Sequence, residues 1–63
     1  MGRQPDLDEV LIEFRRIGNS VKVSAIEPVT NTEVSIVGPA TAGEHALRMA
    51  AIQKLRYVLA KKG

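Results

Sequence analysis

The sequence predicts an α+β domain in which a three-stranded antiparallel β-meander is followed by one C-terminal α-helix packed on one sheet face (βββα). Two observations carry this prediction. The first part of the chain alternates apolar and polar residues with a period of two, broken by turn residues such as Gly18-Asn19, which is typical of half-buried strands. Residues 41–62 instead repeat apolar residues with the period of a helix.

The length of the chain allows a single domain. We expect this domain to occupy residues 8–63, after a polar and flexible tail at residues 1–7. A core of this size rarely supplies more than ~3–5 kcal/mol of stability. The 63 residues include no cysteine, which excludes disulfides and thiolate metal sites. Association with another chain is therefore the obvious remaining source of stability.

The first two strands are expected to form a hairpin from residues 10–17 and 20–26. In both segments apolar residues alternate with polar ones. Gly18-Asn19 supplies a two-residue turn between them, and glycine at its first position favours type II′. If the residues that flank this turn pair, the apolar residues of both strands fall on one face. Turn chemistry and apolar pattern thus predict the same hairpin.

The predicted register also defines the neighbours across the hairpin. The expected pairs are Ile17 with Ser20, Phe14 with Val23, Ile12 with Ala25, Leu11 with Ile26 and Arg15 with Lys22. The last pair places two like charges opposite each other, which is mildly unfavourable. A solvated face tolerates such a pair, and an acidic partner could exploit it.

The third strand is predicted over residues 34–38. Asn31 suits a left-handed position in the preceding turn. A four-residue loop at residues 29–32 would place Ile36 beside Ala25 and keep the apolar residues of this strand on the helix side. A three-residue bulged loop would turn them to the opposite face. We expect the four-residue loop.

The C-terminal helix is predicted over residues 41–62. Thr41 and Glu44 have the spacing of a capping box, and Gly63 follows the last turn. Arg48 interrupts the apolar stripe, and we expect its long side chain to extend past the sheet edge into solvent. The expected core unites this stripe with the inward residues of the strands: Val10, Ile12, Phe14, Val21, Val23, Ala25, Val34, Ile36, Leu47, Ala51, Leu55, Val58 and Leu59.

The face of the sheet opposite the helix is predicted to be open, because one helix covers only one side. Its apolar residues are the candidate protein interface: Leu11, Ile17, Ile26 and Val37. A half-apolar face on an undersized domain favours an interface. The alternative is that β-branched residues simply form good strands on either face. We therefore expect a small non-enzymatic interaction module that forms a homodimer or binds an unidentified protein through this face.

The charge distribution keeps a second function open. The formal net charge is +2, and Arg48 to Lys62 contains five basic residues and no acidic one. Favourable interaction of cations with the C-terminal end of a helix explains this pattern without a ligand. The alternative is a nucleic-acid-binding accessory protein. Its candidate contacts are Arg15, Lys22, Lys54, Arg56, Lys61 and Lys62.

No catalytic, cofactor or metal site is expected. The single histidine, His45, adjoins Glu44, and adjacent residues do not share a helix face. The glycines are scattered and form no phosphate-binding pattern. The chain lacks both an apolar run of about 18 residues and the apolar stretch of a signal peptide. We therefore expect a cytoplasmic protein with no membrane partner.

The run from Phe14 to Lys62, especially VKVSAIEPVTNTEVSIVGPATAGEHALRMAAIQKLRYVLAKK, resembles a family of short uncharacterised bacterial proteins, chiefly alphaproteobacterial. The resemblance covers almost the whole chain after the tail and implies a domain of unknown function. The strand-strand-strand-helix order also resembles part of the double-stranded-RNA-binding domain and a plant-type DNA-binding domain. These last two resemblances concern topology and imply no function.

Overall fold

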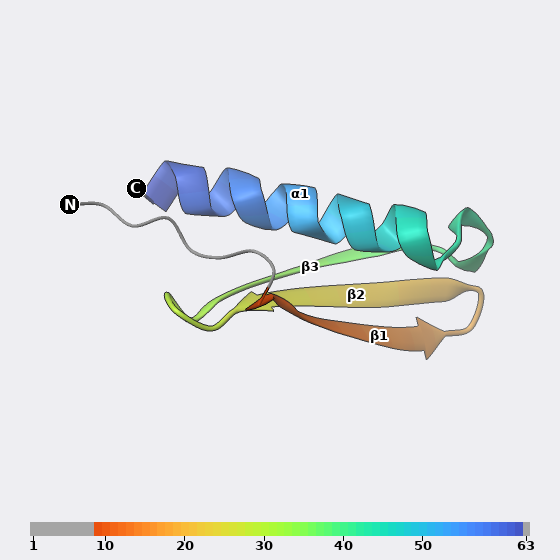
Figure 1. Cartoon of the computed structure of the whole chain (residues 1–63). Helices are drawn as coiled ribbons and strands as arrows, with labels where there is room; N and C mark the ends of the chain where they lie inside the picture. The colour runs from red at the N-terminus through yellow and green to blue at the C-terminus, as the bar shows by residue number, and fades with distance from the viewer. Residues whose placement is uncertain (1–8, 63) are drawn as a thin grey trace.

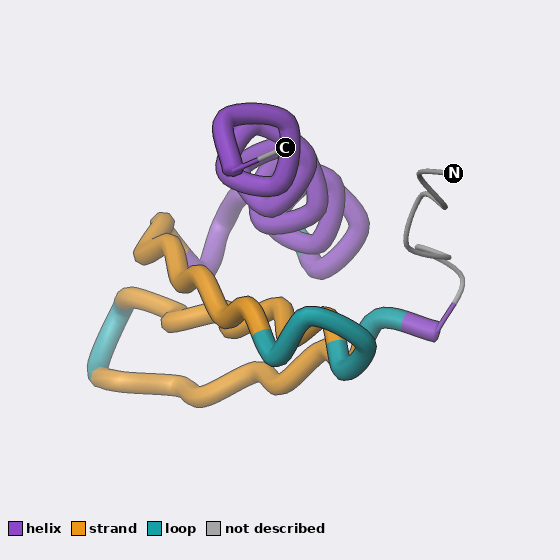
Figure 2. The backbone as a smooth tube through the Cα atoms, turned by 90° about the vertical axis from the view of Figure 1, so that its left-hand side faces the viewer, coloured by secondary structure: helices purple, strands orange, loops and turns teal. Residues whose placement is uncertain are grey.

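The computed structural model of the protein describes residues 9–62 and has the predicted βββα fold. Three strands form one antiparallel sheet in the order β1-β2-β3, and α1 lies across one face (Figure 1). Seen along the helix, sheet and helix form two layers (Figure 2). The predicted tail at residues 1–7 lies outside the described residues. The elements are β1 (Leu11–Ile17), β2 (Ser20–Glu27), β3 (Thr32–Pro39), the 3-10 turn η2 (Ala40–Ala42) and α1 (Glu44–Lys62).

The hairpin of β1 and β2 has the predicted turn and register. Gly18 has a φ of 60°, and Asn19 does not have a positive φ. A type I′ turn needs a positive φ at both positions, so the turn is of type II′. Pairing runs from Leu11 opposite Ile26 to Ile17 opposite Ser20, and every predicted pair is present.

The turn between β2 and β3 differs from the prediction by one residue. The loop is formed by residues 28–31, not 29–32. Ile36 therefore lies opposite Val23 and not beside Ala25. The loop still contains four residues, so the apolar residues of β3 keep their predicted side. The shift is caused by Glu27, the buried residue that directly precedes the loop.

The helix begins three residues later than predicted. Thr41 lies in η2 and is exposed, and Gly43 separates η2 from α1 with a φ of 89° and a ψ of 153°. This conformation interrupts the helical path and is one that glycine adopts readily. The predicted capping box is therefore wrong. Oε1 of Glu44 instead lies 4.0 Å from Nη2 of Arg48, one turn further along the helix.

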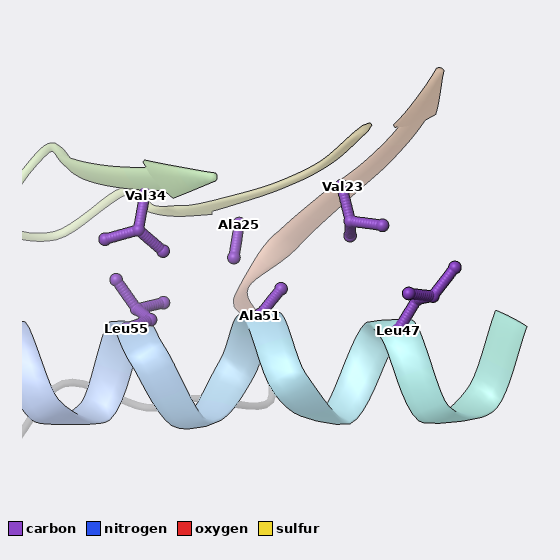
Figure 3. Close-up of a cluster of buried hydrophobic side chains, with 6 residues drawn as sticks. All are labelled: Val23, Ala25, Val34, Leu47, Ala51 and Leu55. Atoms are coloured by element: carbon purple, nitrogen blue, oxygen red, sulfur yellow. The ribbon is translucent and has the colours of Figure 1, made fainter. Parts of the chain in front are cut away.

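The core contains all the residues predicted for it. Six are buried: Val23, Ala25 and Val34 from the sheet, with Leu47, Ala51 and Leu55 from the helix (Figure 3). The other predicted residues are partly buried and pack against this cluster. Ala25 and Ala51 are both fully buried where helix and sheet meet. Their small side chains let α1 lie close to the central strand.

The helix covers β2 and β3 better than it covers β1. It packs mainly against β3 and β2, and β1 is the strand farthest from it (Figure 1). Ile12 and Phe14 on β1 are accordingly only partly buried. The long side chain of Arg48 reaches this strand, with Cζ 5.8 Å from the centre of the Phe14 ring. Arg48 remains 47% exposed, as expected for a side chain that extends past the packed face.

Gly38 leaves space for Leu47, the first buried residue of the helix. A larger residue at position 38 would fill that space. A Cβ atom at Gly38 would lie 2.5 Å from Cδ2 of Leu47. Gly38→Val should therefore lower the free energy of unfolding by ~1–3 kcal/mol through overpacking, as measured by chemical denaturation. Val37→Thr, on the exposed side of the same strand, should change it by less than about 0.5 kcal/mol. Equal stability of Gly38→Val and the unmodified chain would contradict this contact.

Candidate interaction surface

The open face of the sheet carries the four predicted interface residues in two groups. Leu11 lies opposite Ile26 at one end of the hairpin. Ile17 and Val37 lie toward the other end, on the two outer strands. Leu11, Ile17 and Val37 are 59%, 55% and 65% exposed, whereas Ile26 on the central strand is half-buried. The structure thus brings all four onto one face without joining them into a continuous patch.

Two rows with charged residues cross the middle of the open face, and the second of them ends in Val37. In one row, Glu13 is followed by a serine on β2 and a serine on β3. In the next row, Arg15 lies opposite Lys22, which is the predicted like-charge pair. Within residues 9–62, neither cation forms an ion pair. The middle of the open face therefore carries positive charge that the described part of the chain does not neutralise.

The basic candidates for nucleic-acid contact lie on two sides of the molecule. Arg15 and Lys22 are on the open face. Lys54, Arg56 and Lys61 are on the helix, and the side chain of Lys62 lies outside the described residues. Nζ of Lys54 donates a hydrogen bond of 3.0 Å to the backbone carbonyl of Ser35. Nζ of Lys61 lies 5.4 Å from the centre of the Tyr57 ring. These residues do not form one basic surface.

A buried carboxylate closes the loop between β2 and β3. Glu27 is fully buried at the end of β2. Its Oε2 accepts a hydrogen bond of 2.7 Å from the amide of Val29. Its Oε1 accepts one of 2.7 Å from the amide of Thr30 and another from the Thr30 hydroxyl. The carboxylate is thus used to hold the turn, which explains why the loop starts directly after Glu27.

Two further residues complete this turn. Pro28 has no N–H with which to extend the ladder. Asn31 takes the left-handed conformation predicted for it, with a φ of 58°. The hydroxyl groups of Thr30 and Thr32 lie 2.8 Å apart beside the carboxylate. A glutamate followed by proline and then by two spaced threonines was the only sequence signal of this arrangement.

The surroundings of Glu27 give it the character of a structural anion. Burial acts to raise the pKa of its carboxyl, but the hydroxyl and amide of Thr30 and the amide of Val29 lower it more. The net pKa lies below the ordinary value of 4.5. Both oxygens of this buried carboxylate accept hydrogen bonds from the turn, so the group is not exposed to a substrate. Glu27 therefore stabilises the loop and offers no site for acid–base chemistry.

A shallow hollow of about 270 Å³ lies beside the start of α1. Its lining combines apolar residues with two charged ones: Phe14, Arg16, Val21, Ala40, Gly43, Glu44 and Leu47. Nε of Arg16 donates a hydrogen bond of 2.7 Å to the carbonyl of Gly18, at the tip of the hairpin. Within residues 9–62, every buried side-chain polar atom has a hydrogen-bond partner. The hollow therefore contains no unsatisfied buried group that would define a ligand.

Other classes of site have little support in the described part of the chain. No three residues with histidine or carboxylate side chains gather there as ligands for a metal ion. His45 is exposed in the first turn of α1. Within residues 9–62, α1 lacks the long apolar sequence that crossing a bilayer requires. The open sheet face is therefore the most distinctive surface of the domain.

Fold and surface together define a small βββα domain whose single helix leaves one face of a three-stranded sheet uncovered. The chain belongs to a family described as a domain of unknown function (DUF6898), which it matches over residues 7–62. This confirms the resemblance to an uncharacterised family. Neither curated proteins nor solved structures include a significant match to the chain.

The lowered pKa of Glu27 predicts a loss of stability in acid. Because the folded-state pKa lies below 4.5, the ionised carboxylate stabilises the fold fully above about pH 4.5. This stabilisation is lost as the pH falls through the folded-state pKa. The free energy of unfolding of the unmodified chain should therefore exceed that of Glu27→Gln at neutral pH, and the difference should shrink in acid.

The matched control for this prediction is Glu33→Gln, which changes an exposed carboxylate near the same turn. Because this side chain is exposed, the variant should change the free energy of unfolding by less than about 0.5 kcal/mol at neutral pH. Denaturation curves recorded from neutral pH to about pH 3 provide the measurement. A constant difference between Glu27→Gln and the unmodified chain across this range would show that the charge of Glu27 does not hold the loop.

Proposed function

We propose that this chain is a small non-enzymatic protein-interaction module of the cytoplasm, and that it associates through the sheet surface that α1 leaves open. The observation that carries the proposal is the exposure of Leu11, Ile17 and Val37, each of which is more than half exposed. Large aliphatic side chains gain about 25 cal/mol for each Å² that is removed from water. A domain with only six buried apolar residues among those described has much to gain from such burial.

A second copy of the chain is the first candidate partner. The open surface presents an acidic and a basic residue on the same exposed strand, Glu13 and Arg15. Such a surface can pair with its own copy when a two-fold axis brings each charge opposite the other. The charge pattern therefore favours self-association over an all-acidic or all-basic partner.

A non-enzymatic role is supported by the environment of the buried titratable group. Glu27 is the one charged residue that is buried within the described part of the chain, and it is engaged by its own turn. Catalytic groups need a perturbed environment together with access to a substrate. The exposed residues of the sheet offer surface complementarity, which is the requirement for binding a protein.

The second candidate function is a nucleic-acid-binding accessory protein. The observation in its favour is the positive charge of Arg15 and Lys22 on the open face, where neither forms an ion pair within residues 9–62. Among residues 9–62, the separation of these residues from the basic residues of α1 leaves two candidate cations for phosphate binding on this side. Base stacking also lacks aromatic residues on the open face, since Phe14 faces the helix side.

The interaction proposal predicts a concentration-dependent dimer that apolar-to-charged substitutions weaken. Leu11→Lys should raise the dissociation constant by roughly tenfold or more, because a desolvated ammonium is costly at an interface, and its cross-strand neighbour Ile26→Lys should do the same where the two open faces pack against each other. Sedimentation equilibrium over a broad dilution series provides the measurement, and circular dichroism should show an intact helix.

Met49→Lys is the matched control, because Met49 is 50% exposed but lies on the outer side of α1. It should leave the dissociation constant within about threefold of the unmodified value. If the chain associates and none of these substitutions changes its dissociation constant, the open face is not the interface. If the chain stays monomeric throughout, a second copy is not its partner.

The nucleic-acid alternative predicts binding that is steeply dependent on salt. Affinity for a short duplex should fall as the salt concentration rises, and Arg15→Ala should reduce the slope by about one phosphate contact. Fluorescence anisotropy with a labelled duplex provides the measurement. Binding that is absent at low salt, or that does not respond to salt, would remove this alternative.

A further inference from the structure

We propose that two copies of this chain join edge to edge through β1, antiparallel and centred on Phe14, and so form one continuous six-stranded sheet. Both helices then lie on the same side of the combined sheet, because a two-fold axis perpendicular to the sheet keeps the helix-covered faces of the two copies on one side. The inference rests on the self-association proposed above and specifies the strand, its register and the partner.

The two edges of the sheet are not equally accessible. At the β3 edge, Lys54 reaches down from α1, and its Nζ donates a hydrogen bond of 3.0 Å to the Ser35 carbonyl. A lysine placed on an edge strand discourages pairing with another strand. Strand β1 lies farther from α1 (Figure 1), and Arg48 contacts the face of its Phe14 ring, so within residues 9–62 the helix leaves the backbone edge of β1 open. The edge of β1 is therefore the accessible one.

The Lys54 contact also shows which backbone groups of β1 point outward. Because the Ser35 carbonyl accepts from Lys54, it points away from β2. Hydrogen bonding alternates along antiparallel ladders, so Ser24, which lies opposite Ser35, directs its backbone groups toward β1. There it meets Glu13, whose backbone groups therefore point inward. The residues whose N–H and C=O groups face the free edge are the alternate ones: Ile12, Phe14 and Arg16.

The charges of β1 select one register among those that this alternation permits. Outward residues must pair with outward residues, so the two-fold axis can pass through Glu13, Phe14 or Arg15. An axis at Glu13 places two glutamates opposite each other, and an axis at Arg15 places two arginines opposite each other. An axis at Phe14 instead places Glu13 of each copy opposite Arg15 of the other. Like charges opposite each other are destabilising and opposite charges are stabilising, so the register centred on Phe14 is favoured.

The same register pairs the apolar residues at the ends of the strand. Leu11 of each copy lies opposite Ile17 of the other on the open face. These two residues are 59% and 55% exposed in the single chain. The seam therefore covers half of the candidate interface residues and leaves Ile26 and Val37 on a wider open face.

The pairing also gives the apolar residues of β1 on the helix side the cover that α1 does not provide. Phe14 is only partly buried because the helix lies over β2 and β3. In a hydrogen-bonded antiparallel pair the two Cα atoms are about 5.5 Å apart, so the Phe14 rings of the two copies can pack together. The aliphatic part of Arg16 can likewise cover Ile12 of the other copy.

Stacking of two open faces is the competing arrangement. It would enclose Arg15 and Lys22 in the middle of the interface. The two residues directly opposite Lys22 in its own sheet are Arg15 and Val37, and neither is acidic. Burial of a cation without a partner is costly. Edge pairing keeps Lys22 in solvent and brings Glu13 of the second copy beside Arg15. Arg15 of the like-charge pair thus gains an opposite charge across the seam.

Charge reversal tests the register. Glu13→Arg and Arg15→Glu each place like charges opposite each other twice, so each should raise the dimer dissociation constant by at least about tenfold. The double variant restores opposite charges and should return to within about threefold of the unmodified value. Glu33→Arg is the control for net charge, because it makes the same change on β3, and it should have little effect. Unchanged single variants, or a double variant that fails to recover, would overturn the proposed register.

Amide hydrogen exchange on the unmodified chain tests the edge itself and separates it from face stacking. The amides of Ile12, Phe14 and Arg16 should exchange more slowly as the protein concentration rises, whereas the outward amide of Val37 on β3 should not. A dimer in which these β1 amides still exchange freely refutes the edge-pairing proposal and leaves the proposed interaction function standing. A chain that remains monomeric refutes both proposals.

Discussion

One helix has to bury one face of three strands, and its width determines what remains exposed. An α-helix with its side chains is about 10–12 Å across. Adjacent strands lie about 4.8 Å apart, and the outer side chains make three strands wider than one helix. The helix α1 therefore covers β3 and β2 well and β1 poorly (Figure 1). The width of the helix thus leaves β1 poorly covered, and the position of the helix on one side leaves the opposite face of the sheet open.

Small residues determine where the helix lies, and long basic residues connect it to the two edges. Ala25 and Ala51 are buried against each other at the centre of the core (Figure 3). From this position Arg48 reaches the Phe14 ring on β1, and Lys54 reaches the edge of β3. Part of the positive charge of α1 thus has a structural use. This weakens the link between a basic C-terminal half and a nucleic-acid partner.

Membership of a family of unknown function leaves the surface of the domain as the basis for any functional proposal. That surface is incomplete in a specific way: its exposed aliphatic residues are separated by charges that do not neutralise one another within the described residues. A second copy would supply both the missing apolar cover and the missing counter-charges along β1. The charged residues of this edge then serve for specificity, because they permit one register and oppose its neighbours.

The sequence by itself determined which residues face the helix and how the hairpin pairs. Strand alternation and the Gly18 turn depend on residues close together in the sequence, so both could be predicted without the fold. Every residue predicted for the core is part of it. Side-chain contacts and backbone conformations outside these patterns decided the rest. The hydrogen bonds of Glu27 place the second turn one residue earlier than predicted, and Gly43 places the start of the helix three residues later. Lys54 binds the backbone at one edge of the sheet. Only the tertiary structure shows that β1 lies beyond the helix, because apolar periodicity records which face of an element is buried and not which strands its partner covers.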